Sequence, residues 1–169
     1  MWSERESKGS AVFNLGRLLS VLSAHEVEFI VVGGVAATLQ GAPVLTQDMD
    51  IVYRIEESNI VRVKAALDAL NAVARDDPRK LRFDETHLRT RGHKLAMTDA
   101  GALDVLGAIN GNVVYEDLVP SAEELEVTGV VVRVLSLERL VQLKRELGRP
   151  KDLAMLPVLE ATLRERARR

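Results

Sequence analysis

The feature that most constrains the fold of this chain is a pair of short β-strands predicted close together in the sequence. Residues 28–32 are almost entirely apolar and stop at Gly33-Gly34. Residues 48–54 follow after a short segment and show a partly alternating pattern. A strand, a glycine turn, a small helix over residues 35–40 and a second strand therefore form the centre of the predicted structure.

The second strand carries two carboxylates on one face. Successive side chains of a strand point to opposite sides of the sheet, so Asp48 and Asp50 share a side. Carboxylates this close repel each other and cost stability unless a cation joins them. Oxygen ligands of this kind suit Mg²⁺ or Mn²⁺ rather than zinc. On its own, the pair is equally consistent with an exposed strand edge whose charges discourage aggregation.

Gly33 and Gly34 fit a ligand site, because a turn without side chains lets the backbone approach a ligand closely. The small helix that follows would direct free N–H groups at phosphate oxygens. Thr46, just before the acidic strand, is placed to add a hydroxyl contact. Taken alone, the glycine pair is equally consistent with a simple tight turn.

The remaining pattern predicts an α+β protein, in which helices pack on a small mixed β-sheet. Helices are expected over residues 11–25, 56–72, 136–147 and from residue 150 on, and further strands over residues 94–98, 102–109 and 130–135. Residues 74–91 are charged and give no clear assignment. We expect one domain over residues 1–169, with its core at 11–135 and a C-terminal helical part at 136–169.

Composition narrows the possible classes of protein. The 169 residues are 47% hydrophobic and 28% charged, which is typical of an ordinary globular protein. A net charge of −2 gives no overall attraction to nucleic acid, and the absence of Cys excludes disulfides and thiol chemistry. The N-terminus lacks the pattern of a secretory signal and no apolar run is long enough to span a membrane, so we expect a cytoplasmic protein.

The run FIVVGGVAATLQGAPVLTQDMDIVY, residues 29–53, resembles the signature of the DNA polymerase beta-like nucleotidyltransferase superfamily. This resemblance implies the nucleotidyltransferase fold and a third carboxylate on a later, neighbouring strand. Asp104, within the apolar segment 102–106, matches that position. An unpaired Asp is expensive to bury in so apolar a strand, and a metal or a charge partner would account for it. The structural alternative is an Asp at a strand end next to solvent.

The tail VRVLSLERLVQLKRELGRPKDLAMLPVLEATL, residues 132–163, resembles one branch of that superfamily. The branch contains the minimal bacterial nucleotidyltransferases and the AbiEii-type toxins of toxin–antitoxin systems. By resemblance, Lys144 would bind the triphosphate of a nucleotide, and Asp152 would orient Lys144 or help shape the site. Without the resemblance, Lys144 reads as a solvated residue of an amphipathic helix, and Asp152 as an acid favoured by a first helical turn.

Some positions depart from this branch. Val44 stands where the toxin-like members usually carry Arg, and Gly34 stands where Ser is frequent. Residues 154–155, Ala-Met, replace a segment in which a second acid is common. These differences weaken the assignment to the toxin subgroup more than they weaken the catalytic interpretation of the site.

The resemblance implies a transferase that moves a nucleoside monophosphate from an NTP to a hydroxyl group and releases pyrophosphate. Asp48 and Asp50 would hold two Mg²⁺ or Mn²⁺ ions, and Asp104 would bind the second ion and help to take the hydroxyl proton. The backbone of Gly33-Gly34 and the side chain of Lys144 would hold the β- and γ-phosphates. The acceptor is left open as tRNA, a small molecule such as an aminoglycoside, or a partner protein, and a homodimer is also possible.

Two other functions remain open at this stage. The chain is alternatively a non-catalytic module that binds a nucleotide or acts as an antitoxin-like partner, or a structural interaction protein. The arginines of the basic end, residues 164–169, are compatible with an RNA acceptor, although a solvated helix end is the simpler interpretation.

Overall fold

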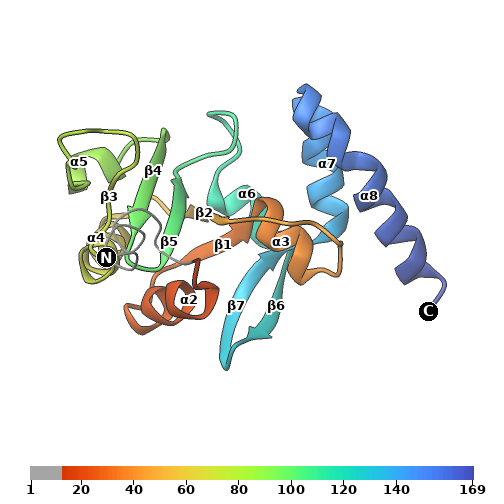
Figure 1. Ribbon diagram of the computed structural model, residues 1–169, viewed down its shortest axis with the longest axis horizontal. Coiled ribbons are helices and arrows are strands. Elements are labelled where there is room, and N and C mark those ends of the chain that lie inside the picture. The colour runs from red at the N-terminus through yellow and green to blue at the C-terminus, as the bar shows by residue number, and fades with distance from the viewer. Residues whose placement is uncertain (1–12) are drawn as a thin grey trace, which may run out of the picture.

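A seven-stranded mixed β-sheet forms the centre of the computed structural model, which describes residues 13–169 (Figure 1). The strands lie in the order β3-β4-β5-β2-β1-β7-β6. Their bounds are β1 Phe29–Val32, β2 Asp48–Tyr53, β3 Val73–Ala74, β4 His93–Thr98, β5 Gly101–Leu106, β6 Ala122–Val127 and β7 Val130–Leu135. The helices are α2 Leu15–Ala24, α3 Gly33–Leu39, α4 Glu57–Ala69, α5 Glu85–Leu88, α6 Tyr115–Leu118, α7 Leu137–Leu147 and α8 Pro150–Ala167, with a 3₁₀ turn at Val119–Ser121.

The acidic strand β2 lies in the middle of this sheet. It pairs antiparallel with β1 and parallel with β5, so strands flank it on both sides. The interpretation of Asp48 and Asp50 as an exposed strand edge is therefore wrong. The mixed pairing also confirms the predicted α+β class with a mixed sheet.

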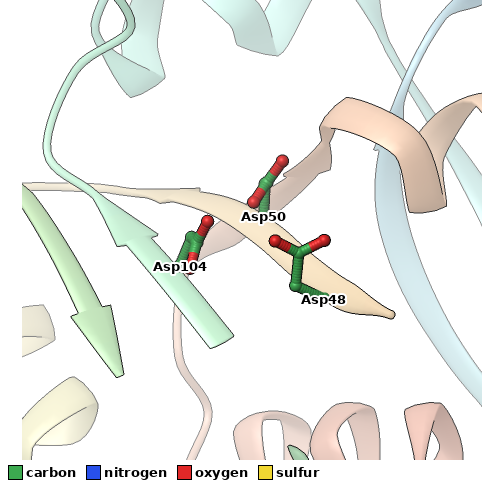
Figure 2. Close-up of side chains that lie close together, drawn as sticks. All are labelled: Asp48, Asp50 and Asp104. Atoms are coloured by element: carbon green, nitrogen blue, oxygen red, sulfur yellow. The ribbon is translucent and has the colours of Figure 1, made fainter. Parts of the chain in front are cut away.

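The two sides of β2 and β5 differ sharply in polarity. Met49, Ile51, Leu103 and Val105 alternate with the acidic residues and are completely buried. In Figure 2 the side chains of Asp48, Asp50 and Asp104 point away from the helices that lie below the sheet, so the alternating apolar residues face those helices. The polar residues of the same strands consequently project from the other side, which these helices leave uncovered.

A buried amide ties the first two strands to α4. Asn59 is 0% exposed and accepts a hydrogen bond from the backbone N–H of Glu28 at 2.7 Å. Its own amide group donates to the backbone oxygens of Glu28 and Arg54, at 3.1 and 2.8 Å. The start of β1 and the end of β2 are thereby fixed relative to each other, which sets the register of the acidic strand.

Most predicted elements are present, with shifted ends. The helix expected from residue 11 begins at Leu15, and residues 11 and 12 lie outside the described part of the chain. The small helix begins at Gly33 rather than at residue 35. The unassigned segment 74–91 contains the short helix α5 and the end of the two-residue strand β3. The division into one domain with a helical C-terminal part stays a prediction.

Apart from the 3₁₀ turn at Val119–Ser121, two elements between residues 110 and 129 were not predicted. Strand β6 has the sequence AEELEV, whose glutamates conceal the alternating pattern, and it forms one edge of the sheet. Helix α6 has only four residues, too few for a helical period to show.

The two C-terminal helices pack against each other at one end of the molecule (Figure 1). Ser136 caps α7, as predicted, and Gly148 ends it with a φ of 60°, a value that favours glycine. Helix α8 begins at Pro150 and continues through Pro157. Within residues 13–169, no helix combines the length and the apolar character needed to cross a membrane.

Candidate active site

Three carboxylates gather on the open side of the sheet, as Figure 2 shows. Asp48 and Asp50 come from β2, and Asp104 comes from the middle of β5, where it is the register partner of Asp50. One carboxylate oxygen from each of the three residues lies within 4.8 Å of the others. The parallel pairing of β2 and β5 therefore brings together the three acids singled out from the sequence, and the strand-end interpretation of Asp104 is wrong.

The charges of this cluster are unfavourable without a cation. Burial raises the pKa of Asp50 to about 8, and the neighbouring carboxylates of Asp104 and Asp48 add to the effect, whereas Lys144 opposes it. A proton on Asp50 relieves the repulsion in the metal-free protein. A divalent cation would relieve it equally, and three carboxylates form the oxygen-donor set that Mg²⁺ or Mn²⁺ prefers. The residues present thus fit a metal site.

Gly33 is required by the position of Asp50. A β-carbon on Gly33 would lie 2.1 Å from a carboxylate oxygen of Asp50, and its φ of +68° also favours glycine. A β-carbon on Gly34 would lie 3.2 Å from the side chain of Thr46, a tight but less severe contact. The glycines therefore lie where the Asp50 and Thr46 side chains leave little room for side chains of their own, and the interpretation as a simple tight turn is insufficient.

The hydroxyl group of Thr46 contacts the acidic strand. It donates to the backbone oxygen of Asp48 at 2.9 Å and lies 3.2 Å from an oxygen of the Asp48 carboxylate. These contacts fix the start of β2 and orient Asp48. The hydroxyl that was expected to reach a phosphate is thus engaged with a member of the acidic cluster, and its contact with a nucleotide stays a prediction.

A cavity of about 360 Å³ lies between the open side of the sheet and α7. Gly33, Asp50, Asp104 and Lys144 all line it, so four of the predicted site residues share one space. The rest of the lining is mostly apolar, with a few basic or polar groups, and comprises Val32, His93, Leu95, Leu106, Ile109, Asn110, Leu140, Leu143, Leu147, Arg149 and Lys151. The other predicted site residues, which lie outside this lining, are Gly34, Thr46, Asp48 and Asp152.

Lys144 is held in place by a buried carboxylate. Its Nζ atom lies 2.9 Å from Oδ1 of Asp152, and the Lys144 side chain is only 21% exposed. Arg149 also pairs with Asp152, through Nε at 2.6 Å from Oδ2. Lys144 is therefore not the solvated residue that its helix alone suggests.

Asp152 stays ionised although it is 0% exposed. Burial by itself would raise its pKa, but the hydrogen bonds from Arg149 and Lys144 outweigh burial and lower the pKa to about 2. Asp152 also accepts a bond from the backbone N–H of Arg149, which caps α8. One carboxylate thus orients two cations that line the cavity.

Several residues of this site were not assigned a role from the sequence. Arg75 pairs with a carboxylate of the cluster, but it belongs to the charged segment that showed no periodicity. Arg149 and Lys151 were visible in the tail motif, and their position beside two assigned residues is the signal that could have identified them. His93 and Leu95 also line the cavity, but single residues on a strand carry no such signal.

Comparison with known proteins agrees with this geometry. Residues 11–168 match the model of the family described as "Nucleotidyl transferase of unknown function (DUF2204)". The chain belongs to this family. Its members are nucleotidyltransferases by that description, so the enzyme class expected from the sequence is confirmed. No curated protein sequence matches the chain significantly.

Two solved structures share the fold of this nucleotidyltransferase. TM1012 from Thermotoga maritima, a candidate nucleotidyltransferase, has 24% identity and a TM-score of 0.56 over 85% of this chain and 88% of its own. ANT(2″)-Ia, solved in complex with adenylyl-2″-tobramycin, has 16% identity and a TM-score of 0.55 over 87% of this chain and 86% of its own. These likenesses confirm the nucleotidyltransferase fold that the resemblance to the polymerase beta-like superfamily implied.

Proposed function

We propose that this protein transfers a nucleoside monophosphate from an NTP to a hydroxyl group of an acceptor, with Mg²⁺ or Mn²⁺ at the acidic cluster. The observation that carries the proposal is the meeting of Asp48, Asp50 and Asp104 beside Gly33. The acceptor oxygen forms a bond to the α-phosphorus, the bond to the pyrophosphate oxygen breaks, and the hydroxyl proton passes to Asp104 or to solvent. When bound there, the divalent cation supplies positive charge to the triphosphate and to the attacking oxygen.

The leaving pyrophosphate is assigned to the side of the cavity formed by Gly33 and Lys144. Gly33 lines the cavity beside Asp50, and because it has no side chain, phosphate oxygens can approach its backbone closely. The ammonium group of Lys144 lines the same cavity and is held there by Asp152. A positioned cation next to the leaving group stabilises the charge that develops on it. Further positive charge on this side comes from α8 and the residue before it, through Lys151 and Arg149.

The acceptor is assigned to the opposite side, over β5 and β4. The nucleophile and the leaving group lie roughly in line in a phosphoryl-transfer reaction, so the hydroxyl approaches from the side away from Lys144. In the strand order, β5 and β4 lie beyond β2 on that side. Leu95 of β4 is the register partner of Asp104 and is 42% exposed, so the acceptor would contact an apolar surface there.

The charges of the cavity disfavour a polycationic acceptor. Within the described chain, Asp50 and Asp104 are the only carboxylates that line the cavity, and both belong to the acidic cluster. Lys144, Arg149 and Lys151 line the side assigned to the pyrophosphate, and no carboxylate of the lining remains free to bind the ammonium groups of an aminoglycoside. We therefore expect the acceptor to differ from the tobramycin of the ANT(2″)-Ia complex.

A pyrophosphate-release assay tests the proposal. The protein is incubated with each labelled NTP, Mg²⁺ and fractionated cell extract, and labelled products are sought in the RNA, protein and small-molecule fractions. Tobramycin replaces the extract in a parallel reaction, and we expect no adenylyl-tobramycin. A labelled RNA or protein would identify the acceptor class and would be the starting point for testing a toxin role.

Asp48→Asn and Asp104→Asn provide the decisive variants, because Asn keeps the shape of the side chain and removes its charge. Each is expected to lower turnover by more than about 100-fold, since charge stabilisation at the reacting phosphate is lost. Asp117→Asn, in α6 and outside the acidic cluster, serves as the control. Wild-type turnover in both cluster variants would exclude the proposed reaction, and nucleotide binding without turnover in the wild type would favour the non-catalytic alternative.

A further inference from the structure

We infer that Arg75 is a positioning residue that holds Asp104 in the orientation required for metal binding; the inference rests on the proposed function of the acidic cluster. Arg75 directly follows β3, and its backbone N–H donates to the backbone oxygen of Leu95 in β4 at 2.8 Å. Its Nη2 atom donates to Oδ1 of Asp104 at 2.5 Å. The arginine thus reaches the third carboxylate from the side opposite Asp50.

The guanidinium group of Arg75 is anchored to the sheet as well as to the carboxylate. The same Nη2 atom donates to the backbone oxygen of Ala96 at 3.0 Å. The side chains of Arg75 and Asp104 are only 21% and 16% exposed, so both lie mostly out of solvent. A charged donor tied to the backbone fixes the carboxylate that it binds more firmly than a mobile surface cation does.

Within the acidic cluster, Arg75 forms an ion pair with Asp104. Among residues 13–169, it is the only Lys or Arg within 4.0 Å of a carboxylate oxygen of Asp48, Asp50 or Asp104. It contacts one oxygen of Asp104, and the carboxylate has a second oxygen that can bind a cation. Groups that orient a metal ligand through a hydrogen bond in this way commonly contribute to metal affinity.

One nitrogen of the Arg75 guanidinium group has no hydrogen-bond partner in the described part of the chain. This nitrogen is Nε, and it is buried. A buried donor without a partner costs free energy, and buried polar groups in folded proteins are usually satisfied. The Arg75 side chain therefore keeps its hydrogen bond to Asp104 although its Nε atom is left without one.

A role of Arg75 in charge balance and a role in positioning Asp104 predict opposite changes in metal affinity when Arg75 is replaced. A positive charge next to Asp104 repels a second cation, so a role in charge balance alone predicts tighter metal binding in Arg75→Met. A positioning role predicts weaker binding, because Asp104 is then free to rotate away from the cluster. Metal affinity consequently separates the two roles.

The experiment measures Mn²⁺ binding by electron paramagnetic resonance, with and without α,β-methylene-ATP, in the full-length wild type, Arg75→Met and Arg75→Lys. We expect Mn²⁺ affinity to fall by about 10- to 100-fold in Arg75→Met and to be partly restored in Arg75→Lys. Arg79→Met is the control, because Arg79 lies in the same segment, is 74% exposed and pairs only with Asp77 among the described residues. Turnover should fall with Mn²⁺ affinity, while KM for the NTP stays close to the wild-type value.

Unchanged or tighter Mn²⁺ binding in folded Arg75→Met overturns the inference, as does a wild type that binds no Mn²⁺. If Arg75→Met fails to fold, Arg75→Lys decides between the two roles. An ammonium group cannot reproduce the planar contacts of a guanidinium group. If Arg75 positions Asp104, the Arg75→Lys protein must therefore bind Mn²⁺ more weakly than the wild type. Wild-type affinity in Arg75→Lys then counts against the inference. A wild type that binds Mn²⁺ in an Arg75-dependent way but releases no pyrophosphate excludes the transferase proposal and leaves this inference standing.

Discussion

Lys144 lies 2.9 Å from Asp152, a carboxylate that is completely buried and yet ionised. Replacing Asp152 by Asn leaves Lys144 and Arg149 without their anionic partner. We expect the free energy of unfolding to fall by about 2 kcal/mol at neutral pH, because the stabilisation that lowers the pKa of Asp152 from 3.8 to about 2 is lost with the charge. We also expect KM for the NTP to rise several-fold, because Lys144 loses its fixed position.

Urea unfolding and steady-state kinetics measure the two effects of Asp152→Asn. Glu160→Gln is the control, because it removes the more exposed pair with Arg145, whose arginine side chain is 61% exposed, and should cost less than about 1 kcal/mol. The pKa of about 2 predicts that the contribution of Asp152 is present above about pH 4 and is lost as the pH falls towards 2. A loss of stability with an unchanged KM would assign Asp152 a structural role only.

The acidic cluster makes the stability of the metal-free protein depend on pH. The pKa of Asp50 is raised from 3.8 to about 8, so the folded state binds a proton that the unfolded state releases. The contribution of Asp50 to stability is therefore highest below about pH 4 and falls as the pH rises towards 8. We expect Tm in EDTA to decrease between about pH 5 and pH 8, and Asp50→Asn to remove most of this decrease.

Mg²⁺ binds only the folded state and should raise Tm most strongly at the alkaline end of that range, where the proton on Asp50 is most easily displaced. Calorimetric scans at several pH values, with Mg²⁺ and with EDTA, measure this dependence. A level or rising Tm in EDTA over the same range would contradict the raised pKa of Asp50.

Gly33→Ala should damage the site by moving Asp50. Alanine would place a β-carbon 2.1 Å from the Asp50 carboxylate and would also occupy a φ of +68°. Gly129→Ala separates the two effects, because Gly129, in the β6–β7 turn, has a φ of +84° and open space where the methyl group of alanine would lie. We expect the backbone conformation to cost about 1–2 kcal/mol in both variants and only Gly33→Ala to lose metal binding and turnover. Equal metal affinity in the two variants would show that Asp50 can move without consequence.

The acidic cluster could be predicted from the sequence because each of its members lies in a strongly patterned segment. Asp48 and Asp50 share a face through the two-residue period of a strand, and Asp104 stands out as an acid in an apolar run. The glycine pair could be interpreted in the same way, although only the structure shows that Gly33 contacts Asp50 so closely.

The supporting contacts could not be predicted, because they depend on how distant elements pack. Arg75 reaches Asp104 only through the pairing of β3, β4 and β5, and its own segment has no periodic pattern. Lys144 is withdrawn from solvent by the packing of α8 on α7, which the pattern of either helix alone does not reveal. Strand β6 was missed because its glutamates interrupt the apolar pattern at the edge of the sheet.

The parallel pairing of β2 and β5 also determines when the acidic cluster can assemble during synthesis. Asp50 and Asp104 are joined only after β5 has left the ribosome, and Lys144 and Asp152 follow later still. A nascent chain that ends before β5 therefore lacks the third carboxylate of the cluster, and pairing strands so far apart in sequence is intrinsically slow. The proposed site is consequently assembled only after α8, which carries Asp152, has been made.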